Sequence, residues 1–157
     1  MKPRHPKEVK NDDLFCSRLT SIINTSHELV KLTDRIDWAH IDSQCQPFFS
    51  VEGRPAIPSR LMVGLHLLKS MYALSDEAVC ERWIENPYYQ YFCGEEFFQH
   101  RFPIERSSIT HWRKRVGESF FEKLLQESLR IAFDEKALKK NQLQRIVVVT
   151  FPPRIKP

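Results

Sequence analysis

The stretch SRLMVGLHLLKSMY, residues 59–72, decides the fold that this sequence predicts. Its apolar side chains recur three and four positions apart, which places them on one face of a helix. They are Leu61, Met62, Leu65, Leu68, Met71 and Tyr72. Ser59 stands where a helix cap is expected, and Gly64, which costs a helix about 1 kcal/mol relative to alanine, lies inside the pattern. We therefore expect a core helix that another helix approaches closely at Gly64.

Helices are predicted on both sides of this segment. Before it, residues 12–32 carry apolar positions at helical spacing and predict one amphipathic helix, and residues 36–44 predict a shorter one. The connector over residues 47–58 contains prolines and a glycine that break regular structure. We therefore expect the part of the chain before Ser59 to be helical up to this connector.

After the core helix, Ser75-Asp76-Glu77 supplies a hydroxyl cap followed by two acids, which predicts a helix over residues 75–85. Residues 87–92 predict a short aromatic helix, residues 95–105 a loop, and residues 118–140 a long amphipathic helix. The predicted fold class is therefore all-α, a multi-helix bundle.

The C-terminal region breaks this helical pattern. Residues 145–151, RIVVVTF, are continuous and β-branched, which predicts a buried strand that Pro152-Pro153 ends. One strand cannot satisfy its own backbone groups and needs sheet partners. We therefore divide the chain into a disordered basic arm at residues 1–11, a helical domain at 12–141, and a remnant at 142–157 that holds an orphan β-strand of a missing domain.

Charge and hydropathy limit the class of protein. The net charge is +4, and the basic residues gather within residues 2–10, 101–115 and 136–156, which permits binding to a polyanion without requiring it. Charged residues interrupt the best apolar run, and no signal peptide pattern follows Met1. We therefore expect a cytoplasmic protein that does not enter a membrane.

The sequence contains no residue pattern typical of a catalytic or metal-binding site. The four cysteines form no Cys-x-x-Cys pair, and buried reduced thiols explain them better than a site shared with His100 and His111. They are Cys16, Cys45, Cys80 and Cys93. His66, within the core helix, is expected to be a structural histidine. We expect no catalytic residue, no metal site and no cofactor, because no acid, histidine or thiol group has a catalytic spacing.

The candidate binding site is the segment SSITHWRKRVG, residues 107–117. Its apolar positions Ile109, Trp112 and Val116 predict one buried helix face, which leaves the polar and basic side chains toward water. The candidate contacts are Ser107, Ser108, His111, Arg113, Lys114 and Arg115. Hydroxyls at a helix start can bind phosphate, and arginine and lysine can neutralise phosphates or reach guanine. A DNA-reading helix has these properties, and so does an ordinary solvated helix.

This segment could pack against the helices predicted over residues 75–85 and 87–92. The three would then form a helix-turn-helix-like unit, although the connection over residues 94–106 is longer than the classical turn.

Five motifs, in this order and spacing, resemble the opening of InsH-like bacterial insertion-sequence transposases. They are GRP at 53–55, LMVGLHLLK at 61–69, LSDE at 74–77, ENPYYQYFCG at 85–94 and SSITHWRKR at 107–115. The resemblance covers roughly residues 12–150.

The resemblance implies that the helical region precedes an RNase H-like domain whose three acids, the DDE triad, hold divalent metals such as Mg²⁺. The first acid of that triad is expected at the end of the first strand, and here Val149 stands at its position. Residues 152–157 do not resemble the family's continuation. We therefore expect a truncated chain without transposase chemistry, and a metal requirement only for the missing domain.

The function predicted from this resemblance is DNA binding by the N-terminal part of a transposase, and the DNA bound is the terminal inverted repeats of the parent element. The protein is therefore expected to be associated with the nucleoid. Self-association or pairing with intact transposase is also expected. Two alternatives are a truncated inhibitor of transposition and a pseudogene product without a role, and a weaker one is an unrelated helix-turn-helix regulator.

Overall fold

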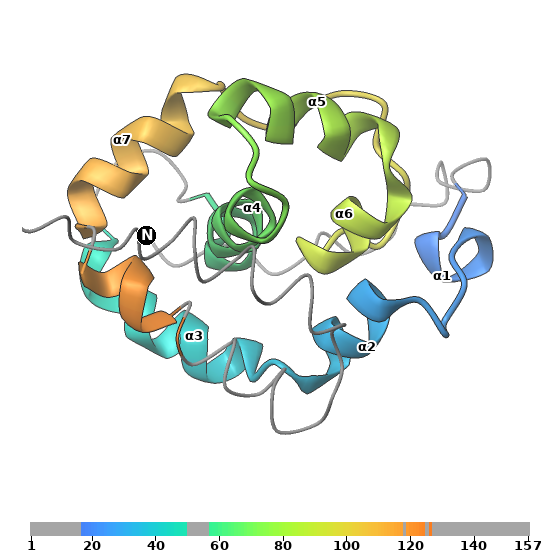
Figure 1. Ribbon diagram of the computed structural model, residues 1–157, viewed down its shortest axis with the longest axis horizontal. Helices are drawn as coiled ribbons and strands as arrows, with labels where there is room; N and C mark the ends of the chain where they lie inside the picture. The colour runs from blue at the N-terminus through green and yellow to red at the C-terminus, as the bar shows by residue number, and fades with distance from the viewer. Residues whose placement is uncertain (1–16, 50–56, 118, 125, 127–157) are drawn as a thin grey trace, which may run out of the picture.

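The computed structural model describes residues 17–49, 57–117, 119–124 and 126, and it is helical almost throughout these ranges (Figure 1). The helices in chain order are α1 (Leu19–Ile22), α2 (Glu28–Arg35), α3 (Trp38–Cys45), the 3₁₀ helix η2 (Gln46–Phe48), α4 (Ser59–Tyr72), α5 (Asp76–Glu85), α6 (Pro87–Phe92) and α7 (Ser107–Val116). Residues 119–124 and 126 are also helical. The only β-type pairing of the described residues is one isolated bridge between Arg18 and Phe97. The predicted all-α class is confirmed.

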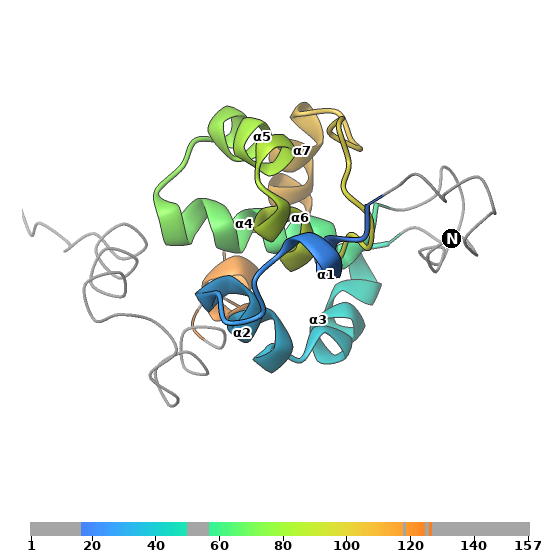
Figure 2. The ribbon, with the colours of Figure 1, turned by 90° about the vertical axis from the view of Figure 1, so that its right-hand side faces the viewer.

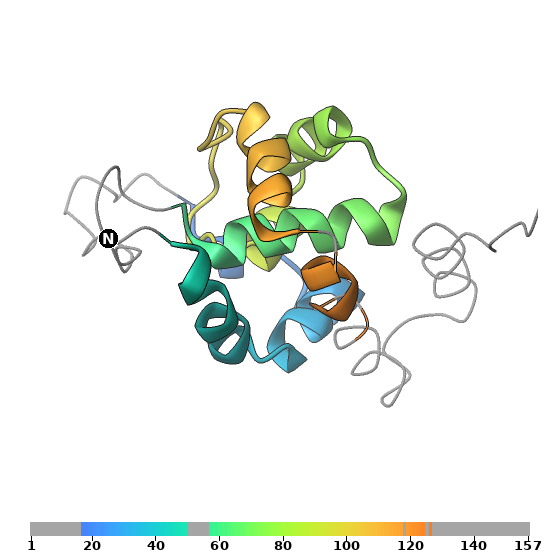
Figure 3. The same cartoon turned by 90° about the vertical axis from the view of Figure 1, so that its left-hand side faces the viewer.

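Helix α4 is the centre of the fold. It lies between α5 and α7 on one side and α2 and α3 on the other (Figures 2 and 3). All residues from Leu61 to Leu68 are buried, so this part of α4 is enclosed on every side and not only along the predicted stripe. A helix surrounded by other elements in this way forms the core of its domain.

Two sequence expectations for α4 had different outcomes. The close approach at Gly64 is confirmed, because a Cβ there would lie 2.9 Å from Sγ and 3.2 Å from Cα of Cys93, at the end of α6. The capping role of Ser59 is wrong, since Pro58 occupies the N-cap position. The Ser59 hydroxyl instead donates a hydrogen bond to the Asp42 carboxylate on α3, which ties the two helices together.

The single helix predicted over residues 12–32 is interrupted. Its described part consists of α1 and α2, separated at Asn24, whose Oδ1 accepts from the backbone N–H of Ser26 at 2.9 Å. The hydroxyl of Tyr88 accepts from the Asn24 N–H at 3.1 Å, and Nδ1 of His27 accepts from the Leu29 N–H at 3.1 Å. Side-chain acceptors that bind backbone N–H groups in this way replace helical hydrogen bonds and end the helix.

The loop between α6 and α7 is held by Gln90, which is fully buried. Its Nε2 donates to the carbonyls of Trp83 (3.1 Å) and Gln99 (2.8 Å), and its Oε1 accepts from the Gln99 N–H at 2.7 Å. A buried amide paired on both its atoms fixes the backbone that it contacts. Gln90 therefore fixes the loop at Gln99, between α6 and α7.

Several predictions fall outside the described residues. They are the basic arm at 1–11, the start of the helix predicted over 12–32, most of the helix predicted over 118–140, and the strand-containing remnant at 142–157. Within the described ranges, none of the helices combines the length and the apolar composition needed to cross a membrane.

Candidate nucleic-acid interface

The predicted buried face of α7 is confirmed. Ile109, Trp112 and Val116 are 1%, 4% and 7% exposed. The helix ends at Gly117, whose φ of 87° is accessible to glycine at little cost and whose N–H donates to the Arg113 carbonyl at 2.9 Å. This face fixes the direction in which every other α7 side chain points.

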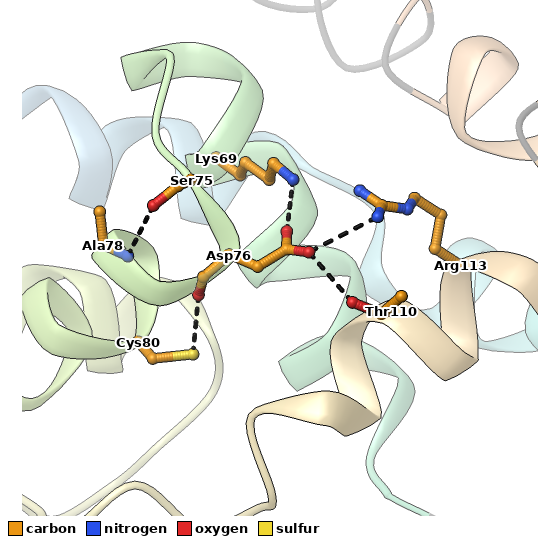
Figure 4. Close-up of polar contacts among 7 residues, drawn as sticks. All are labelled: Lys69, Ser75, Asp76, Ala78, Cys80, Thr110 and Arg113. Carbon is orange, nitrogen blue, oxygen red and sulfur yellow. Dashed lines mark hydrogen bonds and ion pairs between the residues drawn. The ribbon is translucent and has the colours of Figure 1, made fainter.

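A carboxylate on α5 joins α7 to α4 and α5 (Figure 4). Asp76, the first residue of α5, forms an ion pair through Oδ1 with Nζ of Lys69 on α4. Its Oδ2 accepts a hydrogen bond from the Thr110 hydroxyl at 3.2 Å and lies 3.5 Å from Nη2 of Arg113. Three helices therefore meet at one carboxylate, which the sequence had indicated only as an acid in the first turn of a helix.

The net effect of these neighbours is to lower the pKa of Asp76. Partial burial acts in the opposite direction and raises it. The hydrogen bond and charge of Lys69, the charge of Arg113 and the hydroxyl of Thr110 together outweigh that desolvation. Asp76 is therefore ionised at neutral pH, and this charge holds Arg113 against α5.

An aromatic cluster lies beneath α7. The ring of His66 on α4 stacks on Trp112 at 6.1 Å between centroids and contacts Phe121 at 4.2 Å. Burial, followed by the charges of Lys69 and Arg113, lowers the pKa of His66 to about 4, so the ring is neutral at pH 7. The expectation of a structural histidine agrees with this packing.

The six predicted contact residues do not share one environment. Ser107, His111, Lys114 and Arg115 are exposed, whereas Ser108 and Arg113 are half-buried. Arg113 also has an intramolecular partner in Asp76. The structure therefore gathers His111, Lys114 and Arg115 on the outer side of α7 and turns Arg113 toward α5.

One further cation lies beside this surface. Arg106 directly precedes α7, and its Nη1 lies 3.7 Å from Oε1 of Glu81 on α5, with both side chains more than half exposed. The sequence signal for Arg106 was its position immediately before Ser107. Lys69, Asp76 and Thr110 gave no comparable signal, because their association depends on the packing of three helices.

The described thiols are inert. Cys45, Cys80 and Cys93 are free and buried, as the sequence predicted. Burial raises the pKa of Cys45 and of Cys80 to about 11 and raises that of Cys93 as well, so all three remain protonated and poorly nucleophilic. Over the described part of the chain, no three His, Cys, Asp or Glu side chains converge as a metal site would require.

The residues that build this assembly are those of a transposase domain. Residues 17–115 match the family model described as "Transposase domain (DUF772)", and the chain belongs to this family. Over 150 residues it is 49% identical to a Rhizobium meliloti protein described as "Uncharacterized protein ORF8 in nfe locus", an alignment that covers 96% of this chain and 72% of that protein. No solved structure matches the chain. The resemblance to insertion-sequence transposases is confirmed at the level of the family.

Proposed function

We propose that this chain is the DNA-binding part of a transposase and that it recognises the terminal inverted repeats of its element. Membership of the transposase family supports the choice of DNA as the partner. The observation that carries the proposal is the outer side of α7, where exposed His111, Lys114 and Arg115 lie opposite a buried apolar face. Val149, at the position of the expected catalytic acid, leads us to propose binding without strand cleavage.

The arrangement of α5, α6 and α7 supports a helix-turn-helix-like role for α7. Helices α5 and α7 lie on the same side of α4 (Figures 2 and 3), and Asp76 and Glu81 of α5 both contact residues in or next to α7. A helix that is fixed by contacts with a neighbouring helix can enter the major groove of DNA as a rigid unit. Under this proposal the protein is associated with the nucleoid.

The basic and the polar side chains of α7 make different contributions to DNA binding. Lys114 and Arg115 neutralise phosphates, which provides affinity that falls as salt rises. His111 and Ser107 are exposed on the same helix, where they can reach phosphate oxygens or base edges. Phosphate contacts position the protein and base contacts select the sequence.

A fluorescence-anisotropy titration tests the proposal. The full chain is titrated into a labelled duplex with the terminal inverted-repeat sequence of an element of this transposase family, and into a scrambled duplex of equal composition, with EDTA in the buffer. We expect the inverted repeat to bind at least tenfold more tightly, and to do so without divalent metal. Equal affinity for both duplexes would contradict end recognition.

Matched variants locate the surface. Lys114→Ala and Arg115→Ala should each weaken binding to both duplexes and reduce the salt slope by up to about 0.9. Lys31→Ala is the control, because Lys31 is also an exposed lysine and belongs to α2, a helix on the opposite side of α4 from α7. If Lys31→Ala weakens binding as much as Lys114→Ala, the α7 surface is not the site.

A further inference from the structure

We infer that Asp76 prevents Arg113 of α7 from binding DNA phosphates, because the carboxylate is paired with the guanidinium. The inference rests on the proposed function, since it concerns the same surface. It assigns Asp76 a positioning role, and it removes Arg113 from the residues that contact DNA directly.

The geometry of the carboxylate supports this role. Oδ2 of Asp76 is contacted by two residues of α7, the Thr110 hydroxyl at 3.2 Å and Nη2 of Arg113 at 3.5 Å. Thr110 and Arg113 are three positions apart and so lie on the same flank of the helix. The second oxygen, Oδ1, is occupied by Lys69. The carboxylate thus lies between the cations of Lys69 and Arg113 and pairs with both of them (Figure 4).

The Asp76–Arg113 pair is more buried than the ion pair that Arg106, the residue before α7, forms with Glu81. The side chains of Arg113 and Asp76 are 34% and 25% exposed, whereas those of Arg106 and Glu81 are 55% and 63% exposed. Salt and competing phosphates weaken an exposed pair more than a partly buried one. Arg106 is therefore able to exchange Glu81 for a phosphate, while Arg113 stays with Asp76.

The charges of the cluster predict the effect of removing the carboxylate. One anion lies between Lys69 and Arg113, so the cluster carries one net positive charge. Without that anion the two cations repel each other, and Arg113, on the flank of α7, can turn toward water and bind one more phosphate. Such a contact adds affinity for any DNA and therefore lowers the preference for one sequence.

Salt slopes of DNA binding test the inference, because a purely structural role for Asp76 would not steepen them. Asp76→Asn should steepen the slope by up to about 0.9 and lower the ratio of inverted-repeat to scrambled affinity. Asp76→Asn combined with Arg113→Gln should return the slope to the wild-type value. Thr110→Val, which removes a hydroxyl from the same carboxylate without a change of charge, should leave the slope unchanged. A slope that Asp76→Asn does not steepen overturns the inference.

Arg113→Gln in the otherwise wild-type chain tests the inference even if the Asp76→Asn variant does not fold. The Arg113→Gln variant should keep the wild-type salt slope of DNA binding, while Lys114→Gln and Arg115→Gln should each reduce that slope. A reduction by Arg113→Gln equal to that by Lys114→Gln overturns the inference and leaves the proposed function intact. If Lys114→Gln and Arg115→Gln both leave the slope unchanged, the proposed function itself fails, and this inference with it.

Discussion

Cζ of Arg60 on α4 lies 4.7 Å from the centre of the Trp38 ring on α3. The same guanidinium donates from Nη2 to the Tyr91 carbonyl at 3.2 Å and from Nε to the Phe92 carbonyl at 3.3 Å, at the end of α6. One side chain therefore joins α3, α4 and α6, and it donates to two carbonyls in the last turn of α6, of which that of Tyr91 also accepts from the Gly94 N–H at 3.0 Å.

Arg60→Met should lower the free energy of unfolding by about 2 kcal/mol, because it removes two charge-assisted hydrogen bonds and a cation–π contact. Arg60→Lys should lose roughly half as much, since an ammonium keeps the charge but lacks the fork that reaches both carbonyls. Urea denaturation monitored by tryptophan fluorescence measures the free energy of unfolding of both variants. An unchanged midpoint for Arg60→Met would mean that water replaces the guanidinium at the carbonyls.

Gly64→Ala should destabilise the fold by about 1–3 kcal/mol, although alanine is the better helix former. The added Cβ would lie 2.9 Å from Sγ of Cys93, a buried side chain that has little room to move. Thermal unfolding measures the loss.

Cys93→Ala provides the control for that contact. Combined with Gly64→Ala, it removes the sulfur and should recover part of the loss, though not all, because Cα of Cys93 also lies only 3.2 Å from the added atom. Strictly additive effects of the two substitutions would argue against a direct clash.

His66 makes stability depend on pH. Its pKa is lowered from 6.5 to about 4 in the folded state, so between these values the unfolded chain binds a proton that the folded chain does not. Stability should therefore fall as the pH drops from about 6.5 to about 4, by as much as about 3 kcal/mol. Below the folded pKa this contribution no longer changes.

His66→Phe isolates that contribution, because phenylalanine fills a similar volume among Trp112 and Phe121 and does not titrate. Urea denaturation of both proteins at several pH values gives the difference between them, from which the carboxylates shared by both chains cancel. We expect the difference to grow in favour of His66→Phe as the pH falls below 6.5. A difference independent of pH would show that His66 titrates in the folded state as it does in water.

Local patterns were sufficient wherever neighbours in sequence determine the structure. Ser75 was predicted to cap α5, and its Oγ accepts from the Ala78 N–H at 3.0 Å. The buried face and the end of α7 at Gly117 also follow from spacing within one helix. Gly64 was informative because a glycine inside a strong helix pattern requires a reason from outside the helix.

Contacts between residues distant in sequence could not be predicted. The break after α1 involves Tyr88, whose hydroxyl reaches a backbone N–H 64 residues earlier. Arg113 was predicted to contact DNA, because helical spacing gives its angle on α7 but does not indicate the carboxylate of Asp76 beside it. The binding surface was thus predicted from its charges, and the division of those charges between DNA and protein required the packing of three helices.

Gln90 offers a last test of how α7 is held. Gln90→Leu leaves the N–H of Gln99 and the carbonyls of Trp83 and Gln99 without their amide partner, so we expect a loss of about 2–4 kcal/mol in the free energy of unfolding. Hydrogen exchange measures the effect on the loop, and the backbone N–H of Gln99 should lose most of its protection from exchange. Gln44→Leu, at an exposed position of α3, is the matched control and should change neither quantity appreciably. Retained protection at Gln99 in the Gln90→Leu variant would mean that the aromatic side chains of the loop, and not the amide, fix the approach to α7.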